Sequence, residues 1–464
     1  MDPSPIRKPG APRSPAPRVI SFAGAIVAAA ALSGCDMKQA QSDLEAIANF
    51  IAQAERRKAD AREVRDDPIL AAAHRGNVEA VRRMLSEGPD SVRRHVRARD
   101  VAGMTALHFA AWAGSPEITE MLVQAGAVVD ARDAGGVTPF GLAARWGNHA
   151  VMKVLLRHGA NVTHRDDLGK TVLHLAAMYD HAEVCEILIE HGISPNVRDN
   201  HGNTPLHSAA LQARRRSTAV LLKHGANPNA KGFLGYTPLH VASDGSTAKG
   251  EADPELCRLL VQAGADPNAT TEWGATGIFI AANNQDSTIV ATLLELGTDP
   301  RVTQEDGSTA LRSAVMGGGA AVVKLLLERG MNPNERTRNM NGAMIHVAIH
   351  ARDPEIARLL LEHGAIVQAT DQYGRTPLFE AAQNGRCDLV ALLLDHGARV
   401  DTPDRHRRTA LHVAAANGYT ECVRILLEAG AEVHARDVSG DTPMKVAWGK
   451  PVVKDLLREY GAKR

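Results

Sequence analysis

Histidine offers the most material for chemistry in this sequence of 464 residues, which contains 20 histidines. Five of them follow a threonine by three positions in the pattern T-x-L-H, at His108, His174, His207, His240 and His412. Neutral imidazole binds zinc at about 2.0–2.1 Å. Copies of the pattern on successive helices lie about 10 Å apart, the usual separation of packed helices. Two such histidines cannot share one ion, so the sequence predicts no metal site.

The five cysteines are the second set of reactive side chains: Cys35, Cys185, Cys257, Cys387 and Cys422. They form no CxxC pair and no even framework of the kind found in small disulfide-bonded domains. Cys387 and Cys422 lie eleven and thirteen residues after Thr376 and Thr409, at different positions of the same pattern. A disulfide needs Cα atoms closer than about 7 Å. We therefore expect these two cysteines to stay unbridged.

Motifs for catalysis are missing from the sequence. It contains no G-x-S-x-G, no H-E-x-x-H and no protein-kinase signature. Gly169-Lys170-Thr171 imitates the end of a phosphate-binding loop, but His164 stands where the first glycine belongs. Gly317-Gly318-Gly319 could hold an anion before a helix, although a flexible loop is the favoured interpretation. We expect no enzyme activity, no cofactor and no small-molecule substrate.

Cys35 has a setting unlike that of the other cysteines. A basic segment precedes fourteen uncharged residues, Val19–Leu32, which are too few for a helix across a bilayer that needs about 20. Leu32-Ser33-Gly34-Cys35 then resembles the lipobox of bacterial lipoproteins, which implies removal of residues 1–34 and a lipid attached to Cys35. Asp36 resembles a signal for retention at the inner membrane. An uncleaved anchor or a chance L-S-G-C is the alternative.

Residues 35–65 are expected to form a polar helical tether between this anchor and the rest of the chain. An apolar patch (Leu44, Ile47, Phe50, Ile51) offers a partner-helix site as the alternative to a plain spacer. Without residues 1–34 the chain has 49 basic and 52 acidic residues and a net charge of −3. This balance gives no general attraction to nucleic acid.

Residues 66–464 are built on an internal repeat. Threonines recur every 33 residues from Thr105 to Thr237, and the series resumes from Thr276 to Thr309 and from Thr376 to Thr442. The interval from Thr237 to Thr276 is six residues longer, with the excess between two helices, and the pattern decays near Arg338–His346. The period, T-P-L-H, a second helix that ends at glycine and D-x-x-G before the threonine together resemble the ankyrin repeat. The resemblance implies an all-α solenoid of about twelve stacked repeats, each a helix-turn-helix with a β-hairpin finger.

The threonine frame also predicts local structure. Each threonine caps the first helix of its repeat, and proline fits the next position because its missing N–H has no helical partner. Ten glycines should end the second helices with a positive φ: Gly126, Gly159, Gly192, Gly225, Gly264, Gly297, Gly330, Gly364, Gly397 and Gly430. Asp67 opens the first repeat as an N-terminal cap. In the resembled family the histidines bond between turns, so we expect them to be structural.

Candidate binding residues are those that vary between repeats. A basic ladder stands six residues before successive threonines and would suit an acidic partner; the favoured alternative pairs each arginine with the aspartate beside it, Asp100, Asp133, Asp166 or Asp199. The ladder is Arg99, Arg132, Arg165, Arg198 and Lys231. Aromatic residues are expected on the fingertips and on the inner helices, where binding surfaces favour Trp and Tyr, with Trp112 packing between repeats instead. They are Phe233, Tyr236, Trp273 and Tyr373 on fingertips, and Trp146 and Tyr179 on inner helices.

Together these features predict a protein-binding scaffold or regulator, tethered by lipid to the bacterial envelope and facing the periplasm. The alternative is a soluble effector of the same fold that acts on a cytosolic or host partner and in which Cys35 is incidental.

Overall fold

The computed structural model describes residues 67–244, 253–335, 342–351 and 353–462. The predicted signal and tether, the insertion after Asp244 and most of the irregular finger before Gly342 lie outside the described residues. The chain divides into two compact units, residues 1–266 and 267–464.

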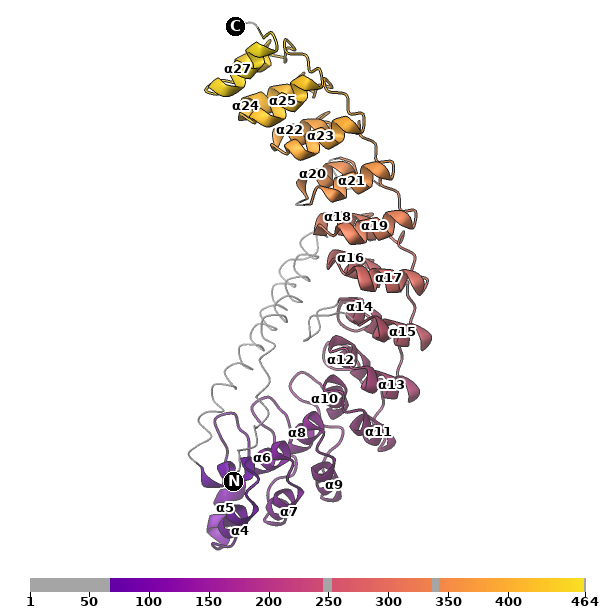
Figure 1. The fold of residues 1–464 in the computed structure, drawn as a ribbon. Helices are drawn as coiled ribbons and strands as arrows, with labels where there is room; N and C mark the ends of the chain where they lie inside the picture. The colour runs from indigo at the N-terminus through magenta and orange to yellow at the C-terminus, as the bar shows by residue number, and fades with distance from the viewer. Residues whose placement is uncertain (1–66, 245–252, 336–341, 352, 463–464) are drawn as a thin grey trace, which may run out of the picture. The chain divides into compact units, whose positions relative to one another are not determined.

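Helices in antiparallel pairs make up the first unit, with one extra helix and one 3-10 turn. Figure 1 shows the pairs in sequence order, α8 to α14 forming one layer and α9 to α15 the other. We call the first helix of a pair inner and the second outer. The pairs are α3 (Pro68–His74) with α4 (Val78–Leu85), α6 (Ala106–Ala113) with α7 (Pro116–Gln124), α8 (Pro139–Trp146) with α9 (His149–Arg157), α10 (Val172–Met178) with α11 (Ala182–Glu190), α12 (Pro205–Leu211) with α13 (Arg215–Lys223), and α14 (Pro238–Ser243) with α15 (Pro254–Gln262); α5 (Pro89–Arg97) and the 3-10 turn η1 (Phe233–Gly235) lie between pairs.

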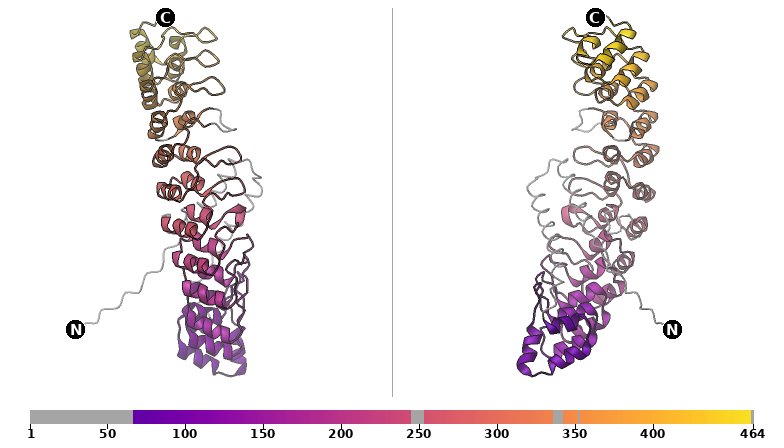
Figure 2. Two further views of the ribbon diagram at one scale, coloured as in Figure 1. Left: turned by 90° about the vertical axis from the view of Figure 1, so that its right-hand side faces the viewer. Right: turned by 60° about the vertical axis from the view of Figure 1, so that its left-hand side comes forward.

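The second unit repeats the same plan with six pairs. Figure 2 shows its connecting segments projecting together from one side of the helices. The pairs are α16 (Gly277–Asn283) with α17 (Ser287–Glu295), α18 (Ala310–Gly317) with α19 (Ala320–Glu328), α20 (Met344–His350) with α21 (Glu355–Glu362), α22 (Pro377–Gln383) with α23 (Cys387–Asp395), α24 (Ala410–Asn417) with α25 (Thr420–Glu428), and α26 (Pro443–Val446) with α27 (Pro451–Glu459). Within the described residues the fold is therefore an all-α repeat solenoid of twelve helix pairs.

Inner helices begin where the threonine frame predicts. Thr138, for example, has extended backbone, and its side chain accepts the N–H of Gly141. The aspartate of the preceding D-x-x-G turn accepts two further backbone N–H groups; Asp133 accepts those of Gly135 and Val137. The ten glycines expected after the outer helices all have positive φ. The expected N-terminal cap at Asp67 also forms, because its carboxylate accepts the N–H of Ile69.

Each T-x-L-H histidine closes the start of its own helix, and His108, His174, His207 and His412 also bond the following repeat. Nδ1 of His207 accepts the N–H of Thr204 at 3.1 Å, and its Nε2 donates to the carbonyl of Tyr236 at 3.0 Å. His174 bonds Thr171 and Asn203 in the same way. Since an amide only donates and a carbonyl only accepts, these bonds select the neutral Nε2–H tautomer. The expectation of a structural role is confirmed for these histidines.

The fingers, by which we mean the segments between one helix pair and the next, differ from expectation. In the described residues they contain no strand, only isolated bridges at Arg99–Thr105 and Arg165–Thr171. The first finger contains the helix α5 (Pro89–Arg97), which begins after Gly88 with proline in its first turn. No helix of the described chain has the length and apolar character needed to cross a membrane.

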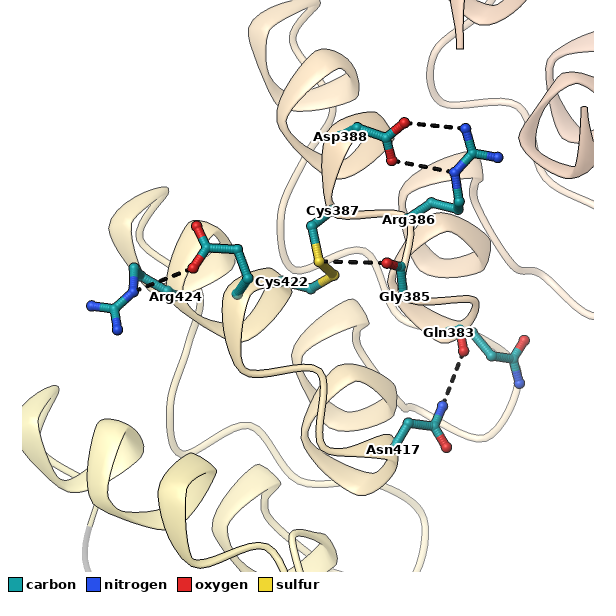
Figure 3. Close-up of a disulfide and its surroundings, with 9 residues drawn as sticks. Gln383, Gly385, Arg386, Cys387, Asp388, Asn417, Cys422 and Arg424 are labelled. Carbon is teal, nitrogen blue, oxygen red and sulfur yellow. Dashed lines mark hydrogen bonds and ion pairs between the residues drawn. A yellow bond between two sulfur atoms is a disulfide. The ribbon is translucent and has the colours of Figure 1, made fainter. Parts of the chain in front are cut away.

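Cys387 and Cys422 form a disulfide with Cα atoms 4.8 Å apart, so the expectation that they stay unbridged is wrong (Figure 3). Stacked repeats meet head to tail: the forward face of one helix touches the backward face of the next. Residues at the same position of the pattern are therefore a whole repeat apart, which a side chain as short as cysteine cannot span, whereas residues at different positions can lie close together. Cys387 opens α23, Cys422 lies in the first turn of α25, and the two helices pack side by side.

Candidate protein-binding surface

Four rings follow one another along the carboxyl ends of the first four inner helices. We call them the aromatic row: His74, Trp112, Trp146 and Tyr179. The centroids of His74 and Trp112 lie 4.9 Å apart, and Trp112 stacks on Trp146 at 6.0 Å with an interplanar angle of 18°. Trp146 is 47% exposed. The rings of His74, Trp112 and Trp146 thus follow one another in contact across three repeats, and Tyr179 lies one repeat further on beneath the guanidinium of Arg145.

The repeat frame explains both the position and the extent of the row. Its members lie seven or eight residues after the residue that caps each inner helix, at the end of the last turn. At the eighth position later repeats place small or polar residues, namely Gln212, Asn284, Gly317, Asn384 and Asn417. Because the helix pairs stack in register, rings at this position in neighbouring repeats must lie side by side.

Arginines accompany the row at the same helix ends. Arg75 follows His74 and is exposed. The guanidinium of Arg145 lies over the ring of Tyr179, 5.0 Å from its centroid, and Nε of Arg214 donates to the carbonyl of Met178 at 3.0 Å. Burial and the charge of Arg75 lower the pKa of His74. The row is therefore a surface of rings and guanidinium groups.

The basic ladder of the fingers has a different arrangement. Nη1 of Arg99 donates to the carbonyl of Gly103 in its own finger, at 2.6 Å, and to that of Arg132 in the next finger, at 2.7 Å. Arg165 and Arg198 make the same two bonds two repeats and three repeats further on. Lys231 is exposed at the end of the ladder. These arginines join neighbouring fingers through backbone carbonyls.

The favoured interpretation, in which each ladder arginine pairs with the aspartate beside it, is wrong. Asp100 and Asp166 accept backbone N–H groups of their own turns. Burial raises the pKa of both carboxyl groups. Arg132 does form an ion pair, but with Asp167 of the next repeat. The turn bonds its aspartate more tightly than an exposed arginine can, since two backbone amides already point at the carboxylate.

Comparisons with known proteins agree with this architecture. A family model for ankyrin repeats in three copies matches residues 37–133, 140–232, 198–271, 239–337 and 335–404, and one for ankyrin repeats in many copies matches residues 393–447. These matches span most of the chain.

This chain belongs to the ankyrin repeat family.

Ankyrin repeats serve as protein–protein interaction modules and are generally non-enzymatic. Among solved structures, the ankyrin repeat domain of human ASB11 matches at 26% identity with a TM-score of 0.45, over 50% of this chain and 99% of that one. A comparison with curated proteins found no match.

The fingertip aromatics of the ankyrin array are divided between its two units. In the first unit Phe233 contacts His201 edge-on at 5.6 Å, and Tyr236 is half-buried near His240. Burial raises the pKa of Tyr236. In the second unit Trp273 is half-buried, and Tyr373 is 51% exposed beneath the guanidinium of Arg375. These four residues stay predicted contacts at their own fingers.

A cluster of charged side chains in the second unit surrounds Glu380. Glu380 is buried, and its carboxylate lies 3.2 Å from Nη2 of Arg375 and 3.8 Å from Nε2 of His350. Burial raises the pKa of Glu380. Arg375 is also paired with Asp371. The cluster brings no nucleophile to the carboxylate, and no metal-holding group of His, Cys, Asp or Glu occurs in the described ranges.

Sequence reasoning found part of the row and missed the rest. Trp146 and Tyr179 were predicted as inner-helix contacts; Trp146 stacks on Trp112, and Tyr179 lies beneath the guanidinium of Arg145. His74 and Arg145 were missed. His74 lies at the same position of its repeat as Trp112, and Arg145 directly precedes Trp146. Alignment of every repeat on its capping residue would have placed the four rings in two adjacent columns.

Proposed function

We propose that this ankyrin array is a lipid-tethered module of a bacterial cell envelope that binds a partner protein and scaffolds or regulates it. The aromatic row carries the binding part of the proposal. Trp and Tyr are enriched among residues that dominate binding energy, and a half-exposed Trp146 stacked on a neighbouring ring is already ordered. An ordered anchor loses little conformational entropy when a partner covers it.

The tether rests on the sequence around Cys35 and has a second line of support. Disulfides persist in oxidising compartments such as the periplasm and are rare in the cytosol. The Cys387–Cys422 disulfide therefore fits a chain that has been exported. In this proposal residues 1–34 are removed, a lipid on Cys35 holds the chain at the inner membrane as Asp36 favours, and the array faces the periplasm. A soluble effector of the same fold is the competing function.

The same proposal assigns the chain no catalysis, no nucleic-acid partner and no small-molecule substrate. Its charges balance over the whole sequence, and the arginines of the finger ladder are bonded to backbone carbonyls rather than presented as a phosphate track.

Replacement of the lipid-acceptor cysteine tests the tether. Cys35→Ala should move the protein from the membrane fraction to the soluble fraction and abolish incorporation of labelled palmitate, because no thiol remains to be acylated. Globomycin, which inhibits the lipoprotein signal peptidase, should cause precursor to accumulate in the wild type. A Cys35→Ala protein that still sediments with membranes would reject the lipid tether.

Removal of the most exposed ring tests the binding surface. Trp146→Ala should weaken capture of partner proteins from detergent-solubilised envelope about tenfold or more, as at other aromatic anchors. Trp448→Ala is the matched control because Trp448 is 85% exposed in the loop before α27 and belongs to the other compact unit. Equal capture by both variants, with circular dichroism showing both folded, would contradict binding at the row.

A further inference from the structure

From the charges beside the aromatic row we infer that its ligand is an acidic and apolar segment of the partner, bound in extended form. Arg75, Arg145 and Arg214 would receive its carboxylates, and the rings would receive its apolar side chains. This inference rests on the proposed function and adds the chemical class of the partner to it.

Ring spacing is the first observation that carries it. Trp112 and Trp146 have centroids 6.0 Å apart, and His74 and Trp112 lie 4.9 Å apart. In an extended chain, side chains on one face recur every two residues, about 6.4–6.8 Å apart. One apolar side chain of an extended segment can therefore contact each ring in turn, with the intervening side chains free to reach the arginines.

Charge is the second and independent observation. Within the described residues none of Arg75, Arg145 and Arg214 forms an ion pair with a carboxylate. The arginines that directly follow Arg214 are both paired, Arg215 with Asp253 and Arg216 with Glu183. Guanidinium groups without an ion pair thus lie along the row, while the two arginines that follow Arg214 are each paired with a carboxylate.

The local bonds leave donors available to a ligand. Nε of Arg145 is buried and out of reach of a ligand, so the donors that this side chain can offer are Nη1 and Nη2 of the guanidinium that stands over Tyr179. Arg214 uses its Nε for the carbonyl of Met178. Asp180, the carboxylate next to Tyr179 in sequence, accepts the backbone N–H of Ser217. A guanidinium fork matches a carboxylate in geometry, so peptide carboxylates suit this edge of the row.

Single-stranded nucleic acid also stacks on rings, but it needs a positively charged groove that follows its backbone. Three arginines over the first five helix pairs supply isolated cations rather than such a groove. The arrangement favours a peptide with a few spaced carboxylates.

A random dodecapeptide phage library, selected on the immobilised full-length protein, tests the chemical class directly. Enriched peptides should carry at least two Asp or Glu residues spaced among Leu, Ile, Val or Phe. Enrichment of neutral or basic peptides would overturn the inference while leaving a protein-binding row intact, because envelope partners would still be captured through Trp146.

Affinity of the most enriched peptide, synthesised with a fluorescent label, then tests the residues. Arg145→Gln and Arg214→Gln should each weaken binding about tenfold, the scale of a hydrogen bond to a charged group. Arg157→Gln should leave it unchanged, because Arg157 ends the outer helix α9, at the opposite end of the antiparallel pair. A rise in salt from about 0.05 to 0.5 M should also weaken binding, since screening shortens the range of charge attraction. Equal affinity of all three variants would overturn the inference.

Two further measurements exclude other occupants. A labelled oligothymidylate should not compete with the peptide for the row. Competition that occurs with the wild type and is lost in Arg145→Gln would assign the row to nucleic acid and overturn the inference. Ile47→Asn with Phe50→Asn should leave peptide affinity unchanged. A clear gain in affinity would show that residues 37–66 of the same chain occupy the row, and would overturn an external partner.

Discussion

At the scale of single residues, histidine in this ankyrin array is a helix cap that works only when neutral. In the T-x-L-H pattern, Nδ1 accepts a backbone amide and Nε2 donates to a carbonyl of the next repeat. A second proton would have to sit on Nδ1 and break the capping bond. Burial lowers the pKa of His174 and His207 to about 4, and it also lowers the pKa of His108 and His412.

Stability should therefore fall as the solution becomes acidic. Histidine in an unfolded chain has a pKa of about 6.5, so between that value and about 4 the unfolded chain binds more protons than the folded one. By pH 5 the free energy of unfolding should drop by about 2 kcal/mol for each histidine as strongly shifted as His207. Urea midpoints measured at pH 7.5 and pH 5 would show this loss.

A matched variant isolates one histidine. His207→Gln keeps an acceptor at the capping position, as glutamine does in a capping box, but it cannot titrate. Its loss of stability between pH 7.5 and pH 5 should be smaller than that of the wild type. Parallel pH curves for the two proteins would contradict the assigned role of the neutral ring.

At the scale of elements, the threonine frame predicted what depends on one repeat and failed where two repeats meet. Helix starts and glycine ends follow from local backbone chemistry, so the sequence placed them well. The first finger was less regular: Gly88, Pro89 and Asp90 are ordinary signals for a helix start, and α5 begins there. The frame of the other repeats predicted a β-hairpin finger at this place.

Contacts between repeats escaped the sequence for a geometric reason. The forward face of one repeat meets the backward face of the next, so partners occupy different positions of the pattern. The Cys387–Cys422 disulfide is of this kind. The bond from Arg99 to the carbonyl of Arg132 is not, because both arginines stand six residues before their threonine and the long side chain of Arg99 reaches the next repeat. The aromatic row is a second exception. Its rings are large enough to touch from equivalent positions, so an alignment of repeats reveals them.

At the scale of the whole molecule, each repeat contacts only its neighbours, so stability is local rather than shared. A covalent link between α23 and α25 should restrain opening of that part of the second unit alone. A disulfide that closes a loop of this length, with 35 residues of separation, stabilises by about 2–4 kcal/mol in the usual chain-entropy account.

Hydrogen exchange of the full chain, followed by mass spectrometry, measures this locality. Cys387→Ser with Cys422→Ser should accelerate exchange in α22–α27, because the disulfide no longer restrains the locally opened state of these helices. Exchange in α3–α13 should stay unchanged, because each repeat contacts only its neighbours and several repeats separate those helices from the disulfide along the chain. A reducing agent should reproduce the effect in the wild type and have no effect on the double variant. Acceleration spread evenly over all helices would mean that the array unfolds as one cooperative body, against the nearest-neighbour behaviour that its stacked pairs predict.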